Sequence, residues 1–393
     1  MKSKSFLPIL ALALGHLVVD LQAGALPIVL PHLKELFALS YSQLAAIVLT
    51  QNITASVIQP VFGYMTDKRS LPGALPYCAA MAGAGFAAIG WAGSYALVLL
   101  TVVVIGVASA TYHPQASKTV NFLSGADNKA KSMGVFSLGG NAGMAVGSIL
   151  MTFLIGLSGG LHNTMYFILP GLLVFGLLMK YMPDYQRVNI EYNIKTAASQ
   201  KQYGAEKLSY MGLFMLLFFI FMRSTIHTGL STYVPLFFMN FRGSDPVFAS
   251  ALVSGFLLGG VAGTYTGAVL SDKLGARRII IGSALLSIPA IWAVTHVQGG
   301  AAAMAAVMAT GFCIIGSFAT TIILAQTMLP NNVGMAAGLT IGFSVGMGGF
   351  GVTILGFLAD HFTLPFVMQV MTWLPVVAAL AALKIPIPAS MHR

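Results

Sequence analysis

The sequence predicts an all-α integral membrane protein with twelve transmembrane helices, arranged as two repeated halves of six. Three observations lead to this fold class. Hydrophobic residues make up 57% of the 393 positions and charged residues only 8%, whereas soluble proteins average about 25% charged residues. The apolar residues fall into twelve runs, each near the roughly 20 residues that a helix needs to cross a bilayer. A polar turn that follows the second run recurs after the eighth.

The twelve runs give the expected boundaries of the spans. One longer polar stretch, rich in Lys, Gln, Asn and Tyr, separates the sixth run from the seventh and is typical of a linker. We therefore expect a first half at 1–182, a cytoplasmic linker at 183–208 and a second half at 209–393. The expected spans are residues 6–30, 42–64, 73–91, 95–116, 131–157, 163–182, 209–238, 247–270, 279–297, 301–328, 334–359 and 364–383.

Basic residues indicate the orientation, with both termini in the cytoplasm. In that topology 17 of the 20 Lys and Arg residues lie in cytoplasmic connections, as the positive-inside rule requires. The distribution accounts for the net charge of +10, so no nucleic acid is expected as a partner. The first run is too long for a signal peptide and contains Asp20, so we expect it to remain as a span. Cys78 and Cys313 both fall within spans, which gives no indication of a disulfide framework.

The repeated turn carries an acid followed by basic residues. In the first half it contains Asp67 and Lys68, and in the second half Asp272, Lys273 and Arg277. The two acids are 205 residues apart, close to half the chain, which indicates a duplication of six helices. We expect both acids to hold a cytoplasmic gate by contacting helix N-termini and nearby bases, because a carboxylate is stabilised by the positive end of a helix dipole.

Glycines recur at four-residue spacing in the fifth and eleventh spans. Such ridges let helix backbones approach closely, and they suit either an interface that slides or rocks, or static packing. The ridges are Gly139, Gly143 and Gly147, and Gly338, Gly342 and Gly346.

The paired turns in a twelve-span chain resemble the major facilitator superfamily, whose two halves rock about a site near the membrane midplane. Nearly the whole chain also resembles the fosmidomycin resistance proteins. That resemblance implies a bacterial efflux transporter of the inner membrane that runs on the proton gradient. It rests on the runs Gly15-His16 to Asp20, Leu26-Pro27, Gln59-Pro60 to Asp67-Lys68, Tyr112-His113-Pro114, Gly139-Gly140-Asn141 and Ala325-Gln326-Thr327-Met328-Leu329-Pro330.

The chain departs from these relatives at three places. Where the fosmidomycin resistance family usually has Glu after His-Pro, this chain has Gln115. If that Glu carries a proton in relatives, here the role falls to Asp20 or a histidine. The Gly-Pro pair and the fourth-span arginine of many antiporters of the superfamily are also absent, since Ser148 follows Gly147 and the fourth span holds no arginine.

Asp20 is the only acid placed well inside a predicted span. A carboxylate at that depth costs roughly 3 kcal/mol on insertion scales, so it normally faces a cavity or a partner and marks an ion or proton path. His16 lies one turn earlier on the same face. Because histidine changes charge near neutral pH, His16, His113 and His227 are the candidates that share the proton with Asp20. For His113, near the predicted end of its span, a gate or packing role is an equal alternative.

Arg223 is the only Lys or Arg placed deep in a span. It is the predicted ligand for a carboxylate, phosphate or phosphonate, because a guanidinium grips oxyanions at two points. The seventh span is the repeat counterpart of the first, so Asp20 and Arg223 are expected at similar depths and could meet across the cavity. Further candidate substrate contacts are Asn52 and Gln59 on a polar stripe of the second span, and Gln115, Asn141, Tyr233 and Gln326.

No catalytic residues, metal ligands or cofactor site are predicted, because the sequence has no phosphate-binding loop, Cys/His cluster or Ser-His-Asp order. We therefore predict a monomeric, non-enzymatic transporter whose partners are a small-molecule substrate, protons and the lipid bilayer. Efflux of a small polar or anionic compound by proton antiport is the first interpretation. An uptake symporter of organic anions and a membrane receptor without transport are the alternatives.

Overall fold

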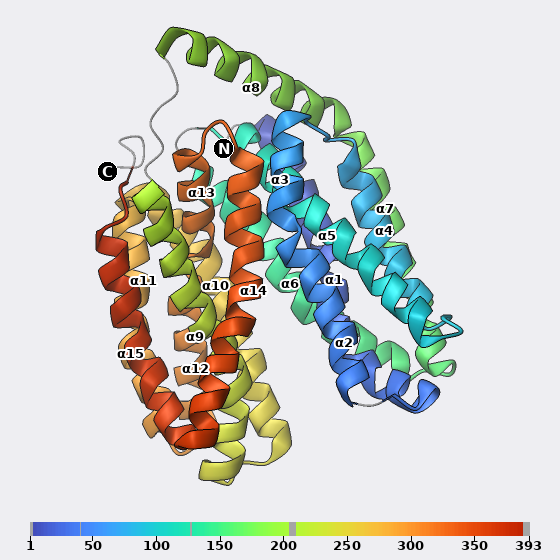
Figure 1. The fold of residues 1–393 in the computed structure, drawn as a ribbon, viewed down its shortest axis with the longest axis vertical. Helices are drawn as coiled ribbons and strands as arrows, with labels where there is room; N and C mark the ends of the chain where they lie inside the picture. The colour runs from blue at the N-terminus through green and yellow to red at the C-terminus, as the bar shows by residue number, and fades with distance from the viewer. Residues whose placement is uncertain (1–2, 40, 126–127, 204–209, 388–393) are drawn as a thin grey trace. The chain divides into compact units, whose positions relative to one another are not determined.

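The computed structural model describes residues 3–39, 41–125, 128–203 and 210–387, and this part of the chain is helical without strands (Figure 1). A π-helical turn at Ile53–Val57 joins α2 to α3, and a 3-10 helix at Gly160–Phe167 precedes α7. The α-helices are α1 (Ser3–Phe37), α2 (Tyr41–Asn52), α3 (Gln59–Lys68), α4 (Ala74–Ile89), α5 (Tyr95–Leu123), α6 (Lys129–Ile155), α7 (Ile168–Lys180), α8 (Met182–Tyr203), α9 (Tyr210–Arg242), α10 (Pro246–Leu274), α11 (Ala276–His296), α12 (Gly300–Ile315), α13 (Phe318–Met328), α14 (Val333–His361) and α15 (Leu364–Leu383).

Each expected span corresponds to one helix or to two consecutive ones. Within the described residues, eleven segments are long and apolar enough to cross a membrane, and the third expected span is the shorter apolar helix α4. The helices often continue past the apolar runs: α5 ends at Leu123 rather than at 116. A helix can extend beyond the hydrocarbon core because its backbone hydrogen bonds are internal and its polar end reaches the interface. The protein is therefore an all-α, multi-pass membrane protein.

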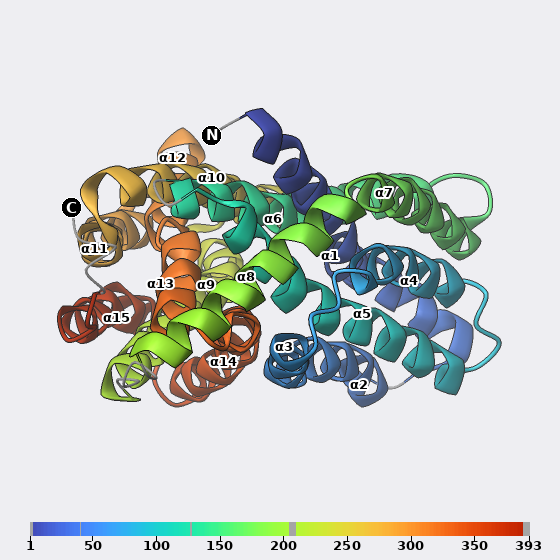
Figure 2. The same cartoon turned by 90° about the horizontal axis from the view of Figure 1, so that it is seen from above.

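The polar stretch between the halves is largely helical, which its composition did not predict. Helix α8 lies across the ends of the helices of the first unit rather than along them (Figures 1 and 2). Buried Tyr185 donates to the Pro8 carbonyl at 3.0 Å, and burial raises the pKa of this hydroxyl above its ordinary range. Tyr192 donates to the Pro330 carbonyl at 2.7 Å and stacks on Phe122 with ring centroids 3.8 Å apart. The expected linker is thus helical as far as Tyr203, and its Tyr185 and Tyr192 side chains pack on the first unit.

The chain forms two compact units. The first contains Met1–Ala126, Val135–Lys207 and Leu329–Gly342, and the second contains Asp127–Gly134, Leu208–Met328 and Phe343–Arg393. The N-terminal turns of α6 therefore belong to the second unit, and those of α14 to the first. Each unit has its own apolar core, built around Phe86 and Phe167 in the first and around Phe256 and Met371 in the second.

The glycine ridge of α6 packs directly against the backbone of α1. A Cβ atom on Gly139 or Gly147 would collide with the carbonyl of Ala13 or Leu21, and one on Gly143 would lie 2.9 Å from the Leu17 carbonyl carbon. The sequence predicted this close approach but not a second ridge in α10. The glycines of this second ridge are Gly259, Gly263 and Gly267. A Cβ atom on each would collide with the carbonyl of Met308, Phe312 or Gly316, respectively.

Each repeated acid caps the N-terminus of a helix in its own unit. The Asp67 carboxylate accepts from the backbone N–H groups of Gly334 at 2.9 Å and Met335 at 2.8 Å, at the start of α14. The Asp272 carboxylate accepts from Ala130 at 3.0 Å and Lys131 at 2.7 Å, at the start of α6. The expected contacts with helix N-termini are therefore present, while their role as a gate stays a prediction.

The base that pairs with Asp67 is not the neighbouring Lys68, which is exposed, but Lys118 of α5. The Lys118 ammonium lies 3.1 Å from the Asp67 carboxylate and donates to the Thr66 carbonyl at 2.9 Å, and both charged side chains are at least 96% buried. In the second turn Lys273 is exposed, and Arg277 donates to the carbonyls of Leu383 and Ile385. Arg277 therefore stabilises the C-terminal end of α15 and the segment after it rather than the capping acid.

We expect Gly143→Ala to lower the free energy of unfolding by about 1–3 kcal/mol, the usual cost of overpacking, because the new methyl group forces α1 and α6 apart. Gly282→Ala in α11 is the matched control, since its Cβ would meet nothing within 4 Å. That substitution should be neutral or should stabilise by about 0.5–1 kcal/mol through helix propensity. Thermal unfolding in detergent measures both, and equal effects would contradict the close packing.

Asp67→Asn should cost roughly 3–5 kcal/mol of stability, because it leaves the Lys118 ammonium buried without its countercharge. Lys68→Gln, at the exposed neighbour, should leave the melting temperature unchanged. Combining Asp67→Asn with Lys118→Met should cost less than the sum of the two single losses. Strictly additive losses in the same unfolding assay would show that the pair contributes no coupling.

Candidate functional site

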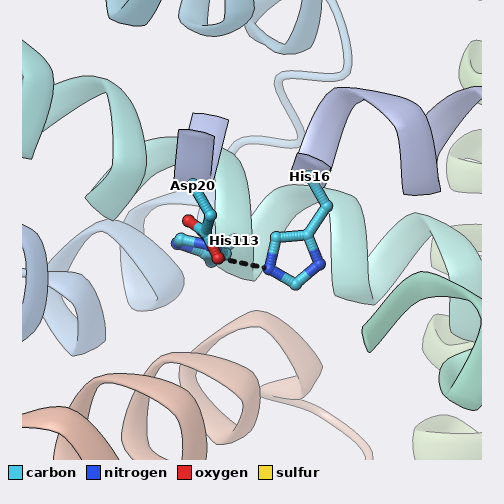
Figure 3. Close-up of side chains that lie close together, drawn as sticks. All are labelled: His16, Asp20 and His113. Carbon is cyan, nitrogen blue, oxygen red and sulfur yellow. Dashed lines mark ion pairs between the residues drawn. The ribbon is translucent and has the colours of Figure 1, made fainter. Parts of the chain in front are cut away.

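Two histidines hold the Asp20 carboxylate inside the membrane helices of the first unit (Figure 3). Helix α1 places His16 one turn before Asp20, and the His16 Nε2 atom lies 3.1 Å from Asp20 Oδ2. Helix α5 supplies His113, whose Nε2 atom lies 3.1 Å from Asp20 Oδ1. Each carboxylate oxygen thus has its own imidazole, and the two rings meet edge to face with centroids 4.7 Å apart. We call these three residues the Asp20 cluster.

A second layer of contacts orients both imidazoles. The His16 Nδ1 atom lies 2.8 Å from the Phe136 carbonyl oxygen, and the Phe136 ring stacks on the His16 ring at 4.2 Å. The His113 Nδ1 atom lies 3.1 Å from the Ser109 hydroxyl, one turn earlier in α5. A Cβ on Gly140 would lie 2.6 Å from His16 Cε1 and 2.7 Å from Asp20 Oδ2. The cluster therefore needs a glycine at position 140.

The cluster is nearly closed to solvent. The exposed fraction is 5% for the His16 side chain, 7% for His113 and 17% for Asp20. In the described chain, the ion pairs of Asp20 are those with the two histidines. Asp20 belongs to the first unit and Arg223 to the second, and a meeting of the two stays a prediction.

The sequence placed His113 near the cytoplasmic end of its span, whereas the structure places it well inside α5. The apolar run ends shortly after Pro114, but buried polar residues continue the helix to Leu123. Proline lacks a backbone N–H and is disfavoured in a helix interior, which made an early end plausible. The correction turns a residue at a predicted helix end into the third member of the Asp20 cluster.

The three side chains could also hold a metal ion. Within the described residues, their potential ligand atoms all lie within 4.8 Å of one another. Two imidazoles and a carboxylate are donors that zinc accepts. Here, however, each imidazole contacts a different carboxylate oxygen at 3.1 Å, a hydrogen-bond length. The geometry favours proton sharing, and the predicted absence of a metal stays a prediction.

Arg223 is the second buried charge at membrane depth, in the core of the second unit. Its side chain donates to the hydroxyls of Thr321 at 3.2 Å and Ser344 at 3.4 Å, and its guanidinium lies 4.9 Å from the centre of the Phe318 ring. Ser344 also hydrogen-bonds Ser224 at 2.6 Å. The interactions described for Arg223 are with hydroxyls and an aromatic face, and a guanidinium has five N–H donors. This is an environment that an oxyanion could complete.

Several hydroxyls on the same helices are buried without a hydrogen-bond partner in the described structure: Thr225 on α9, Thr320 on α13 and Ser317 just before α13. A buried hydroxyl without a partner costs about 1–3 kcal/mol. A polar ligand or water that supplied the missing hydrogen bonds would remove this cost.

The other predicted site residues are dispersed. His227 is half-buried, with its ring 5.4 Å from that of Phe256. The Tyr233 hydroxyl donates to the Val352 carbonyl at 3.0 Å. Gln326 is buried and Asn141 is half-buried. For Tyr233 the structure gives a structural contact, and a substrate role of these residues stays a prediction.

The polar stripe expected on the second span does not share one face. The π-helical turn at Ile53–Val57 shifts the register, so Asn52 is exposed while Ser56 and Gln59 are buried. Gln59 lies against α14, where a Cβ on Gly342 would be 3.0 Å from its Oε1 atom. The wide turn changes the periodicity on which the stripe depended.

Gln115 lies apart from the Asp20 cluster in a fully buried polar network at the α8 end of the unit. Its side-chain oxygen accepts from the Leu71 N–H at 3.3 Å, and its amide donates to Thr119 at 3.2 Å and to Asn189 at 3.5 Å. The amide is thus committed to contacts that hold α8 and the loop before α4. A substrate contact of Gln115, as the sequence suggested, stays a prediction.

Sequence reasoning missed residues that act through the backbone or through long-range contacts. Ser109 was within reach, because it precedes His113 by one turn. Gly140 was visible only as part of a glycine doublet. The Phe136 carbonyl, Lys118 and the hydroxyls around Arg223 carry no signal in one sequence, since tertiary packing brings them to their partners.

Comparison with known proteins identifies the family. The family model described as Major Facilitator Superfamily matches residues 12–340. The fosmidomycin resistance protein of Escherichia coli is 29% identical over 383 residues, which cover 98% of this chain and 93% of that protein. A protein of Bacillus subtilis described as an uncharacterized MFS-type transporter is 30% identical over 379 residues, with 95% and 92% covered.

The fold agrees with solved transporters. The structure of the proton:xylose symporter XylE superposes with a TM-score of 0.77 at 15% sequence identity, covering 99% of this chain and 97% of that one. At this identity the likeness concerns the fold alone. Together with the family match, it shows that the chain belongs to the Major Facilitator Superfamily and is a membrane transporter rather than an enzyme.

Proposed function

We propose that this chain is a proton-coupled secondary transporter that exports a small polar or anionic compound by antiport. The Asp20 cluster carries the proposal, because a carboxylate between two imidazoles inside a membrane helix can bind and release a proton. We place the protein in a bacterial inner membrane as a monomer with both termini in the cytoplasm. The relationship to the Escherichia coli fosmidomycin resistance protein supports this setting.

The proton side of the mechanism needs groups that change charge without disrupting the fold. His16 and His113 are held through their Nδ1 atoms and meet the carboxylate through Nε2. Protons can therefore redistribute among three side chains without a large movement of any of them. His227 has no such carboxylate among its described contacts, so it is the weakest of the three histidine candidates.

The substrate side rests on Arg223. Arg223 is 94% buried with hydroxyl partners, and a buried guanidinium is costly unless an anion joins it. A phosphonate, phosphate or carboxylate would receive two parallel N–H bonds there. This argument supports an anionic substrate, and the name of the Escherichia coli relative makes fosmidomycin the first probe to use.

An uptake symporter of organic anions is the second candidate. A proton on the Asp20 cluster and an anion on Arg223 have opposite charges, so moving them together through a low-dielectric interior would cost less than moving either alone. Proteoliposomes that contain the purified protein and an internal pH dye decide between the two. Antiport predicts that fosmidomycin and protons move in opposite directions, and symport predicts the same direction. Binding without movement of either would indicate a receptor and overturn the proposal.

Asp20→Asn should abolish transport of fosmidomycin driven by a pH gradient while leaving its binding largely intact. Asparagine keeps the shape of the side chain but neither binds nor releases a proton at physiological pH. Asp184→Asn is the control, since Asp184 forms an exposed pair with Arg187. Gradient-driven transport by the Asp20 variant at the wild-type rate would refute the role of this carboxylate.

Arg223→Lys should weaken fosmidomycin binding at least several-fold, because the ammonium keeps the charge but loses the planar fork. Arg242→Lys is the matched control. Arg242 is the last residue of the same helix, α9, and donates to the Thr295 carbonyl of α11. Equal losses for both variants, or equal losses for an anionic and a neutral ligand, would indicate that Arg223 is structural.

A further inference from the structure

Hydrogen-bond geometry distinguishes the two histidines of the Asp20 cluster. A carbonyl oxygen can only accept, so the His16 Nδ1 atom, 2.8 Å from the Phe136 carbonyl, carries a hydrogen. In a neutral imidazole the other ring nitrogen is then a bare acceptor. That nitrogen, Nε2, lies 3.1 Å from Asp20 Oδ2. With His16 neutral and Asp20 ionised, two acceptors would face each other at hydrogen-bond distance.

One additional proton resolves this conflict. It can sit on His16 Nε2, giving an imidazolium beside a carboxylate, or on Asp20 Oδ2, giving a carboxylic acid that donates to a neutral imidazole. Both arrangements have the same net charge and the same atoms. The observed contact is therefore that of a pair loaded with one shared proton.

His113 needs no such proton. A hydroxyl can donate or accept, so Ser109 can donate to His113 Nδ1 while Nε2, 3.1 Å from Asp20 Oδ1, carries the hydrogen. The neutral ring thus turns a hydrogen rather than a lone pair toward the carboxylate, although the contact is not aligned as a hydrogen bond in the described structure. The two histidines touch the same carboxylate but differ because one is backed by a carbonyl and the other by a hydroxyl.

The remaining titratable groups around the cluster do not alter this assignment. Beside His113, α5 also contributes Tyr112, whose hydroxyl donates to the Leu12 carbonyl at 2.7 Å. Buried Cys78 of α4 and Tyr185 of α8 interact with Tyr112, and the Tyr185 hydroxyl donates to the Pro8 carbonyl. On α6 the groups that face the cluster are the Phe136 carbonyl and Gly140. Among the described groups, the charges that act on the Asp20 carboxylate are those of His16 and His113, and Asp20 in turn acts on the Tyr112 hydroxyl.

We propose that the coupled proton is held between His16 Nε2 and Asp20 Oδ2, that His113 remains a neutral donor, and that loss of this proton drives Asp20 away from His16. This inference rests on the proposed proton coupling and specifies where the proton binds. Release leaves the His16 lone pair facing an anionic oxygen, a repulsive contact. The His16 ring is held by Phe136 and Gly140, so Asp20 and the turn of α1 that carries it are the parts that move.

The test compares variants that each remove one histidine. Proton uptake by the purified protein in detergent with EDTA is measured by titration from alkaline to mildly acidic pH. In both His16→Gln and His113→Gln the new amide can donate to the Asp20 carboxylate. We expect His16→Gln to take up about one proton fewer than wild type, because the shared proton belongs to the pair, and His113→Gln to match wild type. Asp20→Asn, which keeps both rings, should lose the same proton as His16→Gln.

The outcomes are distinct. Equal losses in the two histidine variants, or a loss confined to His113→Gln, would overturn the assignment. A second result would also overturn it: no proton uptake by wild type in EDTA, together with proton release when zinc is added without EDTA. That result would indicate a metal site. Variants are compared only when their melting temperatures match that of wild type. If His16→Gln does not fold, Asp20→Asn replaces it as the variant that lacks the shared proton. Because uptake needs neither substrate nor gradient, a shared proton without coupled movement in proteoliposomes would refute the proposed function while confirming where the proton binds.

Discussion

The close contact between α1 and α6 is the constraint on which the first unit depends. Gly139, Gly143 and Gly147 allow the backbone of α6 to lie on the carbonyls of α1, a distance that any larger residue would increase. Only at this separation can the His16 ring reach the Phe136 carbonyl and stack on its side chain. Backbone packing thus fixes the orientation of an ionisable side chain, and that orientation decides how many protons the Asp20 cluster holds.

The buried charges follow different rules in the two units. In the first, Asp20 has imidazole partners and Asp67 has both helix N–H groups and an ammonium. In the second, Arg223 is surrounded by hydroxyls. Burial of an ion is tolerated only with compensation. Compensation by hydroxyls is weaker than by a full countercharge, which makes the second unit the better place for a ligand that brings its own charge.

Much of the fold was predictable because it follows from composition and apolar run length. The order of spans, the repeated acidic turn and the glycine ridge of α6 all depend on local patterns or on fixed spacing. The helical state of α8 was not predictable in this way, because Tyr185, Asn189 and Tyr192 bind the distant residues Pro8, Thr119 and Pro330. The π-helical turn in the second span is likewise a local change of helix type that the apolar pattern does not reveal.

The site was predictable in part. Helical periodicity alone paired His16 with Asp20, and depth alone singled out Arg223. The third member, His113, required a contact between α1 and α5 that a single sequence does not contain. The tautomer of His16 depends on a backbone carbonyl of α6, and no choice of side-chain type could have indicated it.

The network around Gln115 has a consequence for how related sequences vary. Its amide donates to Asn189 of α8 while its oxygen accepts from the Leu71 N–H. A glutamate, the usual residue in the fosmidomycin resistance family, can accept from Leu71 in the same way, but when ionised it has no hydrogen to give to the Asn189 oxygen. Relatives with glutamate at this position should therefore carry a donor such as lysine, or a reoriented amide, where Asn189 stands. Positions 115 and 189 should therefore covary across the family although they are 74 positions apart in the sequence.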